Sequence, residues 1–201
     1  MNYFICGEKL LAFNPKCATS TFSWAILRQY YPEIVDQLNK HTKWANDGKT
    51  EDQMLHGWVP KKASPYKKQV AQIIREPVSR FRSAVGFMNL VGRTGTIEEI
   101  IDDLINETNS LEGITNTIAS NFHFRPQSRF KGDITYFRMD QLQECADFLG
   151  IKVCLKTINK TRHDKPTLTK EQEEIVRDYY AEDVALWDSL QESNKKEMLC
   201  L

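Results

Sequence analysis

Two short stretches of the sequence carry residues whose types and spacing suit them to binding anions. The first, PKCATST, covers residues 15–21 and lies between an apolar run and a segment of helical periodicity. A strand that enters a helix through a tight turn presents free backbone N–H groups at the helix N-terminus. Lys16 adds a positive charge there, and Thr19, Ser20 and Thr21 add hydroxyl groups. The stretch therefore predicts a local anion site.

The second stretch, REPVSRFRSA, follows the buried run QVAQII and repeats the same order of strand, loop and helix. Arg75 stands where the strand should end, and Pro77 suits the first turn of a helix. Arginine offers a planar fork that matches a phosphate group. Ser83 follows about two helical turns later and offers a hydroxyl. Arg80 and Arg82 lie on the same helix, where they face either a ligand or, more commonly, solvent.

Regular elements are expected around both stretches. Alternating strands and helices indicate an α/β fold with a mainly parallel central sheet flanked by helices. Ligands of such sheets bind at the carboxyl ends of the strands, so two anion loops there suit a ligand with anionic groups at both ends. The expected elements are a hairpin around Gly7-Glu8, strands over 10–13, 69–74, 133–137 and 151–155, and helices from Thr19, from Pro77, over 96–106, 111–120 and 140–149, and from 167–170 to about Glu192.

Both stretches resemble the nucleotide-binding motifs of sulfotransferases. PKCATSTF resembles the 5′-phosphosulfate loop, commonly P-K-x-G-x-[ST]-[ST], and REPVSRFRSA resembles the 3′-phosphate motif R-[DE]-P-x-x-R-x-x-S. Ala18 replaces the common glycine, as in the loop P-K-x-A-S-T-S of the uronyl 2-O-sulfotransferases of heparan and dermatan sulfate. Later segments over 123–127, 133–151 and 168–187 are also similar to this family, so the resemblance spans roughly residues 10–187.

The resemblance implies a P-loop-containing nucleotide-kinase-like fold and a single sulfotransferase domain over residues 1–201. It implies 3′-phosphoadenosine 5′-phosphosulfate as the cosubstrate, with Lys16 on the oxygen that bridges phosphate and sulfate. Arg75 and Ser83 would hold the 3′-phosphate. The residues implied at the 5′ end are Lys16, Cys17, Ala18, Thr19, Ser20 and Thr21.

Sulfuryl transfer to a hydroxyl needs a general base, and histidine has a suitable pKa. Among four histidines, His56 in MLHGWVP best matches the place of the base in the resembled family. His123 in NFHFRPQ is the competing candidate, and His41 is a weaker one. No aromatic residue is selected for adenine among Trp24, Trp44, Trp58 and Phe87. The roles of Lys160 and Arg162, close to His163, also stay open.

The overall composition limits the classes of partner and the location that the chain is expected to have. Basic and acidic residues both number 27, so no overall charge favours nucleic acid or an anionic membrane. No apolar run approaches the roughly 20 residues of a membrane span. The N-terminus lacks the basic region of a signal peptide. Five cysteines without paired metal-type spacing indicate reduced thiols, a cytoplasmic protein and no metal.

Three functions follow as expectations. The first is a sulfotransferase acting on a small-molecule or carbohydrate acceptor, with the acceptor and the oligomeric state undefined. The second is a P-loop kinase-like phosphotransferase, although the G-x-x-x-x-G-K-[ST] loop is absent. The third is a catalytically inactive nucleotide-binding protein.

Overall fold

The computed structural model describes residues 3–35, 61–62, 68–90, 96–109, 123–130, 132–153, 155 and 165–199. The chain forms two compact units. The first combines Met1–Ile73 with Phe130–Lys160, and the second combines Ile74–Arg129 with Thr161–Leu201. Each unit thus joins two separated stretches of the chain, so the units are not successive domains. The expectation of a single domain stays a prediction.

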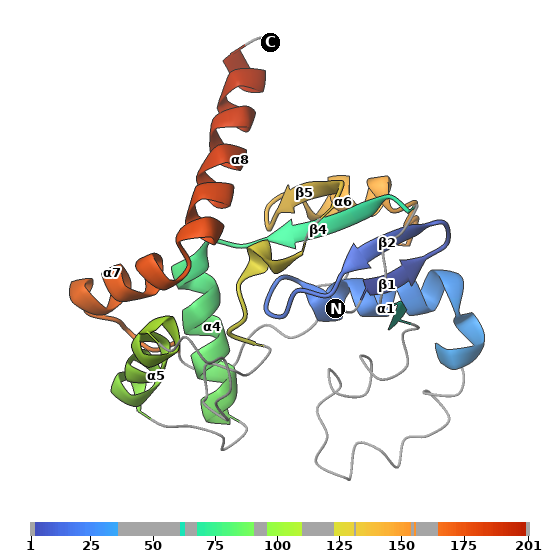
Figure 1. Ribbon diagram of the computed structural model, residues 1–201. Coiled ribbons are helices and arrows are strands. Elements are labelled where there is room, and N and C mark those ends of the chain that lie inside the picture. The colour runs from blue at the N-terminus through green and yellow to red at the C-terminus, as the bar shows by residue number, and fades with distance from the viewer. Residues whose placement is uncertain are drawn as a thin grey trace. The chain divides into compact units, whose positions relative to one another are not determined.

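The first unit is built on a mixed sheet (Figure 1). Its five strands lie in the order β3-β1-β2-β4-β5. β1 runs antiparallel to both β2 and β3, whereas β2 runs parallel to β4. The expectation of a mostly parallel sheet is therefore wrong. The strands are β1 (Tyr3–Cys6), β2 (Lys9–Ala12), β3 (Lys61–Lys62), β4 (Val70–Ile74) and β5 (Ile134–Arg138).

The N-terminal hairpin explains why the sheet is mixed. Cys6 pairs with Lys9 across a two-residue turn, and Gly7 in that turn has a φ of 59°. Glycine adopts this left-handed conformation without the steric cost that other residues meet. The expected hairpin is thereby confirmed, but its second strand also pairs with β4 and so brings antiparallel strands into the central sheet.

Side chains alternate between the two faces of this sheet, as extended strands require. Phe4 and Leu11 are register partners and join a core with Phe22 and Ile26 of α1 (Thr19–Tyr30). Their neighbours in the strands, among them Leu10, belong to a separate core with Phe130. Helix α6 (Leu142–Phe148) adds Cys145 and Ala146 to the first of these cores. The expected helix start at Thr19 is confirmed.

The second unit is helical. Its core joins apolar side chains of α4 and α5 to those of α7 and the segment before η3. Its elements are α4 (Pro77–Leu90), α5 (Ile97–Asn109), η3 (Gln127–Arg129), α7 (Lys170–Tyr179) and α8 (Ala181–Leu199). The expected helix start at Pro77 is confirmed. A capping box begins α7, because Thr169 accepts from the Gln172 N–H and the Gln172 side chain accepts from the Thr169 N–H.

Some expected elements differ. Residues 151–153 and 155 are not in a strand, and the long C-terminal helical region is two helices that separate at Tyr180. The expected helix over 111–120 lies outside the described residues. In the described part of the chain, no helix has the length and apolar character needed to cross a membrane.

Candidate functional site

The loop between β2 and α1 has an unusual backbone. Lys16 has a φ of 66° and Ala18 a φ of 53°, both in the left-handed region, while Cys17 between them is not. Left-handed and right-handed residues in alternation turn successive N–H groups toward one side, which makes an anion-binding concavity. The first stretch that the sequence singled out therefore has a backbone suited to an anion.

The start of α1 adds further N–H groups to this loop. Ala18 is the N-cap of the helix, and it has no side-chain hydrogen bond to the first turn. Most helices place Ser, Thr, Asp or Asn at this position, because the first N–H groups have no acceptor within the helix. The first backbone bond of α1 joins the Phe22 N–H to the Ala18 carbonyl at 3.1 Å. An alanine N-cap leaves the capping of the earlier N–H groups to another acceptor.

Internal hydrogen bonds fix the shape of the loop. The Asn14 carbonyl accepts from the Cys17 N–H at 3.3 Å and from the Thr19 hydroxyl at 2.8 Å. The Asn14 amide nitrogen Nδ2 donates to the carbonyl of Ile73 in β4 at 3.0 Å. The Cys17 N–H and the Thr19 hydroxyl, both predicted to hold phosphate, thus donate within the loop. Asn14 ties this loop to β4, a role that the sequence did not indicate.

Exposure separates the predicted residues of this loop. Cys17, Thr19 and Thr21 are buried, with side chains only 2%, 8% and 7% exposed. Lys16, Ala18 and Ser20 are half-buried. Lys16 and Ser20 are therefore the polar side chains of the stretch that a ligand can reach.

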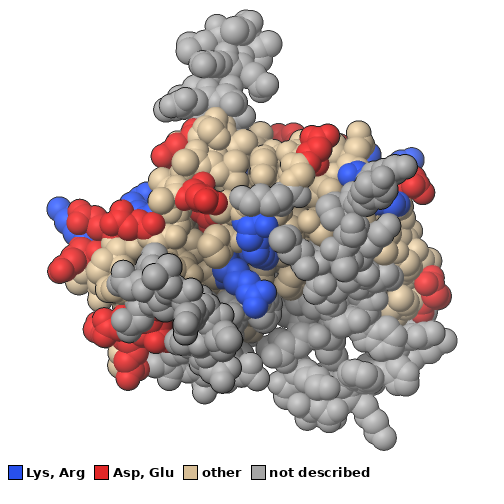
Figure 2. All heavy atoms as spheres, in the orientation of Figure 1, with Lys and Arg blue, Asp and Glu red and all other residues tan. Residues whose placement is uncertain are grey.

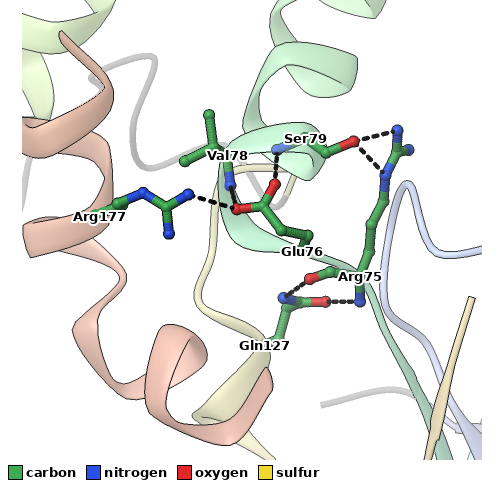
Figure 3. A network of polar contacts seen from close by, with 6 residues as sticks. All are labelled: Arg75, Glu76, Val78, Ser79, Gln127 and Arg177. Atoms are coloured by element: carbon green, nitrogen blue, oxygen red, sulfur yellow. Dashed lines mark hydrogen bonds and ion pairs between the residues drawn. The ribbon is translucent and has the colours of Figure 1, made fainter. Parts of the chain in front are cut away.

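The second stretch is held by a different kind of structure, a network of side chains (Figure 3). The Arg75 guanidinium donates through Nε and Nη2 to the Ser79 hydroxyl, at 3.2 and 2.9 Å. Glu76 accepts from the N–H groups of Val78 and Ser79, at 3.2 and 2.6 Å, and so caps the start of α4. Glu76 also pairs with Arg177 at 3.4 Å. Capping and ion pairing together fix the backbone that carries Arg75.

Ser83 is placed differently from Ser79. It is 2% exposed on α4, whereas Ser79 is half-buried beside the arginine. The motif points to Ser83 by resemblance, whereas the Arg75 guanidinium donates to the hydroxyl of Ser79, which the motif does not indicate. The usable signal was proximity in the chain, because Ser79 lies in the first turn of α4, only four residues after Arg75.

The two further arginines of α4 differ in burial. Arg80 is 1% exposed, and its Nη2 donates to the carbonyls of His123 and Arg125 at 3.1 and 2.7 Å. Its guanidinium also lies over the Tyr180 ring, 5.9 Å from the centroid. Arg82 is half-buried and donates through Nε to the Pro166 carbonyl at 2.7 Å. The expectation of a solvated face is wrong for Arg80, which braces the second unit.

A third cation belongs near this loop. Partial burial lowers the pKa of Lys165, and the positive charges of Arg75 and Arg82 lower it further. Arg82 donates to the carbonyl of Pro166, the neighbour of Lys165 in the chain, which places Lys165 beside Arg82. Neighbouring cations favour an anion. By contrast, acidic side chains gather over α5 and α7 on the face drawn in Figure 2. Lys165 belongs to neither motif. It lies 83 residues after Arg82 and 90 residues after Arg75 in the chain, so the sequence does not show that these charges are neighbours.

The proposed base cannot be placed. His56 lies outside the described residues, as do His41, Trp44, Trp58, Lys160, Arg162 and His163. The competing base, His123, is half-buried, and its ring stacks on Phe87 with centroids 4.9 Å apart. The structure therefore does not choose between His56 and His123.

The predicted residues divide between the two units. Residues 16–21 belong to the first unit, whereas Arg75 and Ser83 belong to the second. Comparisons with protein-family models, with curated proteins and with solved structures gave no match.

Proposed function

We propose that this chain is a sulfotransferase that moves the sulfuryl group of 3′-phosphoadenosine 5′-phosphosulfate to a hydroxyl acceptor, most simply a carbohydrate. The observation that carries the proposal is the loop before α1. It combines left-handed residues at Lys16 and Ala18 with a helix whose N-cap has no capping side chain. This backbone suits a phosphate, and the sequence around it resembles the sulfotransferase loop. A P-loop nucleotide-kinase-like fold is part of the same proposal.

The residues present fit the two charged ends of that nucleotide. At the 5′ end, the half-buried Lys16 and Ser20 would meet the phosphosulfate together with N–H groups of α1. At the 3′ end, Arg75 and Lys165 offer positive charges that match a phosphate. β2 pairs in parallel with β4, and Arg75 directly follows β4 in the chain. The proposal requires both loops to reach one ligand.

The residues have distinct tasks in the reaction. The nucleotide supplies an activated sulfuryl group. As the acceptor oxygen attacks sulfur in line, its proton passes to a base, for which His56 is the first candidate and His123 the second. The S–O bond to the 5′-phosphate breaks, and Lys16 stabilises the negative charge that develops on the departing oxygen. The products are a sulfate ester, 3′-phosphoadenosine 5′-phosphate and the protonated base.

Two other functions make different predictions. A P-loop kinase-like phosphotransferase would bind ATP with Mg²⁺, and a nucleotide-binding protein without turnover would bind the sulfate donor but not consume it. Ligands that bind the native state raise the melting temperature. Thermal melting with 3′-phosphoadenosine 5′-phosphate is expected to show a clear rise, and melting with ATP and Mg²⁺ a smaller one. A larger rise with ATP and Mg²⁺ would contradict the proposal.

A turnover assay then separates an enzyme from a binding protein. Labelled donor is incubated with sugars, phenols and steroids, and transfer to a sugar hydroxyl is the expected result. Binding of the nucleotide without transfer to any acceptor would favour the inactive binding protein.

A further inference from the structure

A side-chain amide holds the backbone of Arg75 from both sides. The Arg75 N–H donates to Oε1 of Gln127 at 3.0 Å, and Nε2 of Gln127 donates to the Arg75 carbonyl at 2.8 Å (Figure 3). Gln127 is fully buried, so neither bond competes with bulk water. Two antiparallel bonds to one residue fix its backbone as a paired strand would.

Gln127 is itself held by a buried carboxylate in the first turn of α8. Asp183 accepts from the Gln127 N–H through Oδ2 and from the Ser128 N–H through Oδ1, each at 2.7 Å. Asp183 is 0% exposed. Burying a carboxylate is costly unless charge-assisted hydrogen bonds offset the loss of water. Both oxygens of Asp183 are satisfied in this way, so the residue fixes the turn that presents Gln127.

Three groups thus act in series, from Asp183 through Gln127 to Arg75. The guanidinium of Arg75 is oriented separately by the Ser79 hydroxyl. Backbone and side chain of one arginine are therefore both constrained by neighbouring groups. Constraint of this degree suits a residue that must meet a ligand in one geometry.

We propose that Gln127, fixed by Asp183, is a positioning residue for Arg75 in the site of the nucleotide 3′-phosphate. The proposal rests on the proposed function, because it takes the 3′-phosphate as the ligand of Arg75. Gln127 touches the backbone of Arg75 and not the phosphate. Its loss leaves the charge of Arg75 in place but loosens the geometry in which that charge is offered.

Gln127→Leu is the direct test, with Gln29→Leu as its matched control. Gln29 also holds backbone with both ends of its amide, since it donates to the Gly150 carbonyl and accepts from the Lys152 N–H, each at 2.5 Å. It lies in the first unit and belongs to neither anion loop. Each substitution removes one pair of hydrogen bonds between a side-chain amide and the backbone, and the two variants have the same composition.

The measurement is calorimetric titration with 3′-phosphoadenosine 5′-phosphate and with adenosine 5′-phosphate, after thermal melting has established that each variant is folded. In Gln127→Leu, the preference for the 3′-phosphorylated nucleotide is expected to fall about tenfold, as for one charge-assisted hydrogen bond. Binding of adenosine 5′-phosphate should change little. Gln29→Leu should keep the preference of the wild type. Asp183→Asn keeps the size of the side chain and should lose part of the preference.

The outcomes separate the two claims. If the wild-type chain binds both nucleotides equally, the 3′-phosphate site is contradicted, and so is the proposed function. If the wild type prefers the 3′-phosphorylated nucleotide and a folded Gln127→Leu keeps all of that preference, the positioning role of Gln127 is overturned, but the proposed function is not. The same holds if Gln29→Leu loses as much preference as Gln127→Leu. If Gln127→Leu does not fold, an unchanged preference in Asp183→Asn overturns the role.

Discussion

The two loops that we propose to bind the anionic ends of the nucleotide are built by different means. The loop before α1 relies on its backbone, because Lys16 and Ala18 adopt left-handed conformations and Asn14 closes the turn. The loop before α4 relies on side chains, because Glu76 caps the helix and Gln127 holds the arginine. One site is made of residues close in sequence, and the other is assembled from distant ones.

This difference predicts which substitutions should disturb each loop. A loop built on its backbone should respond most to substitutions that change conformational preference at Lys16 and Ala18. A network of side chains should respond to the loss of any partner, even one distant from the ligand.

Loss of the proposed base, His56, should have the largest effect. His56→Ala is expected to lower turnover by about 10²–10⁴-fold, the usual range for a general base. Donor affinity should stay nearly intact, because the base acts only on the acceptor proton. The wild-type rate should rise with pH through a histidine pKa near 6.5 if that pKa is unperturbed. Turnover against pH, with donor affinity measured separately, checks this.

Lys16→Ala is the comparison within the first loop. It should weaken donor binding and slow turnover together while it keeps the rise of rate with pH, because Lys16 acts on the donor. If His56→Ala keeps full activity and a folded His123→Ala loses it, the base is His123.

Loss of Arg80, which braces the second unit, should lower stability. Arg80→Leu removes a donor from the partly buried carbonyl of His123 and the shorter of two hydrogen bonds to the carbonyl of Arg125, which also accepts from Arg129 at 3.4 Å. The free energy of unfolding should fall by about 2–4 kcal/mol. Arg82→Leu, at a half-buried position on the same helix, should cost about 1 kcal/mol or less. Urea unfolding of both variants checks the order, and equal losses would show that Arg80 is not the brace.

Loss of Arg75, the arginine proposed to hold the 3′-phosphate, should be selective. Arg75→Ala is expected to weaken binding of 3′-phosphoadenosine 5′-phosphate by about 2–3 kcal/mol, from the lost charge-assisted hydrogen bonds. Binding of adenosine 5′-phosphosulfate, which lacks the 3′-phosphate, should barely change. Calorimetric titration of both ligands gives the answer, and equal losses would count against the assignment.

Alkaline pH should weaken the first unit through its buried thiols. Burial raises the pKa of Cys6 to about 12 and also raises the pKa of Cys145. Above the usual thiol pKa of about 8.5, the unfolded thiols lose protons that the folded ones keep. The free energy of unfolding should therefore fall as pH rises, by up to about 1.4 kcal/mol per pH unit for each thiol.

Urea unfolding between about pH 8 and 10, a range that spans the usual thiol pKa, measures how the free energy of unfolding changes with pH. The double variant Cys6→Ala and Cys145→Ala should flatten it. A slope that persists unchanged in the double variant would place its origin elsewhere.

Relief of the left-handed backbone should have the smallest effect. Ala18→Gly removes a steric cost of roughly 1–2 kcal/mol at a φ of 53°, while glycine costs more backbone entropy on folding. A net gain in stability of about 0.5–1 kcal/mol is expected, with nucleotide binding kept. Thermal melting of the variant tests this, and a loss of stability would mean that the loop backbone is not strained there.

Local signals made much of the fold predictable. Gly7 marks the hairpin turn and Pro77 the start of α4, and both act within a few residues. Strand pairing is a tertiary choice. The sequence indicated the hairpin but not its pairing with β4, which makes the sheet mixed.

The candidate site follows the same rule. Lys16 and Arg75 could be named because each stands in a motif that can be read along the chain. The partners of Arg75 could not. Gln127 lies 52 residues away from Arg75, and Asp183 lies 56 residues beyond Gln127. Contacts of such separation depend on how the helices pack, which no local pattern of residues specifies.

A single titration tests whether both loops bind one ligand, as the proposed function requires. The wild-type chain is titrated with adenosine 5′-phosphate, with adenosine 3′-phosphate and with the nucleotide that carries both phosphates. If each loop holds one end of the same molecule, the bisphosphate should bind about 10²–10⁴-fold more tightly than either monophosphate, and the two monophosphates should compete through their shared adenosine. A bisphosphate that binds no more tightly than the better monophosphate, with both monophosphates bound at once, would contradict the account.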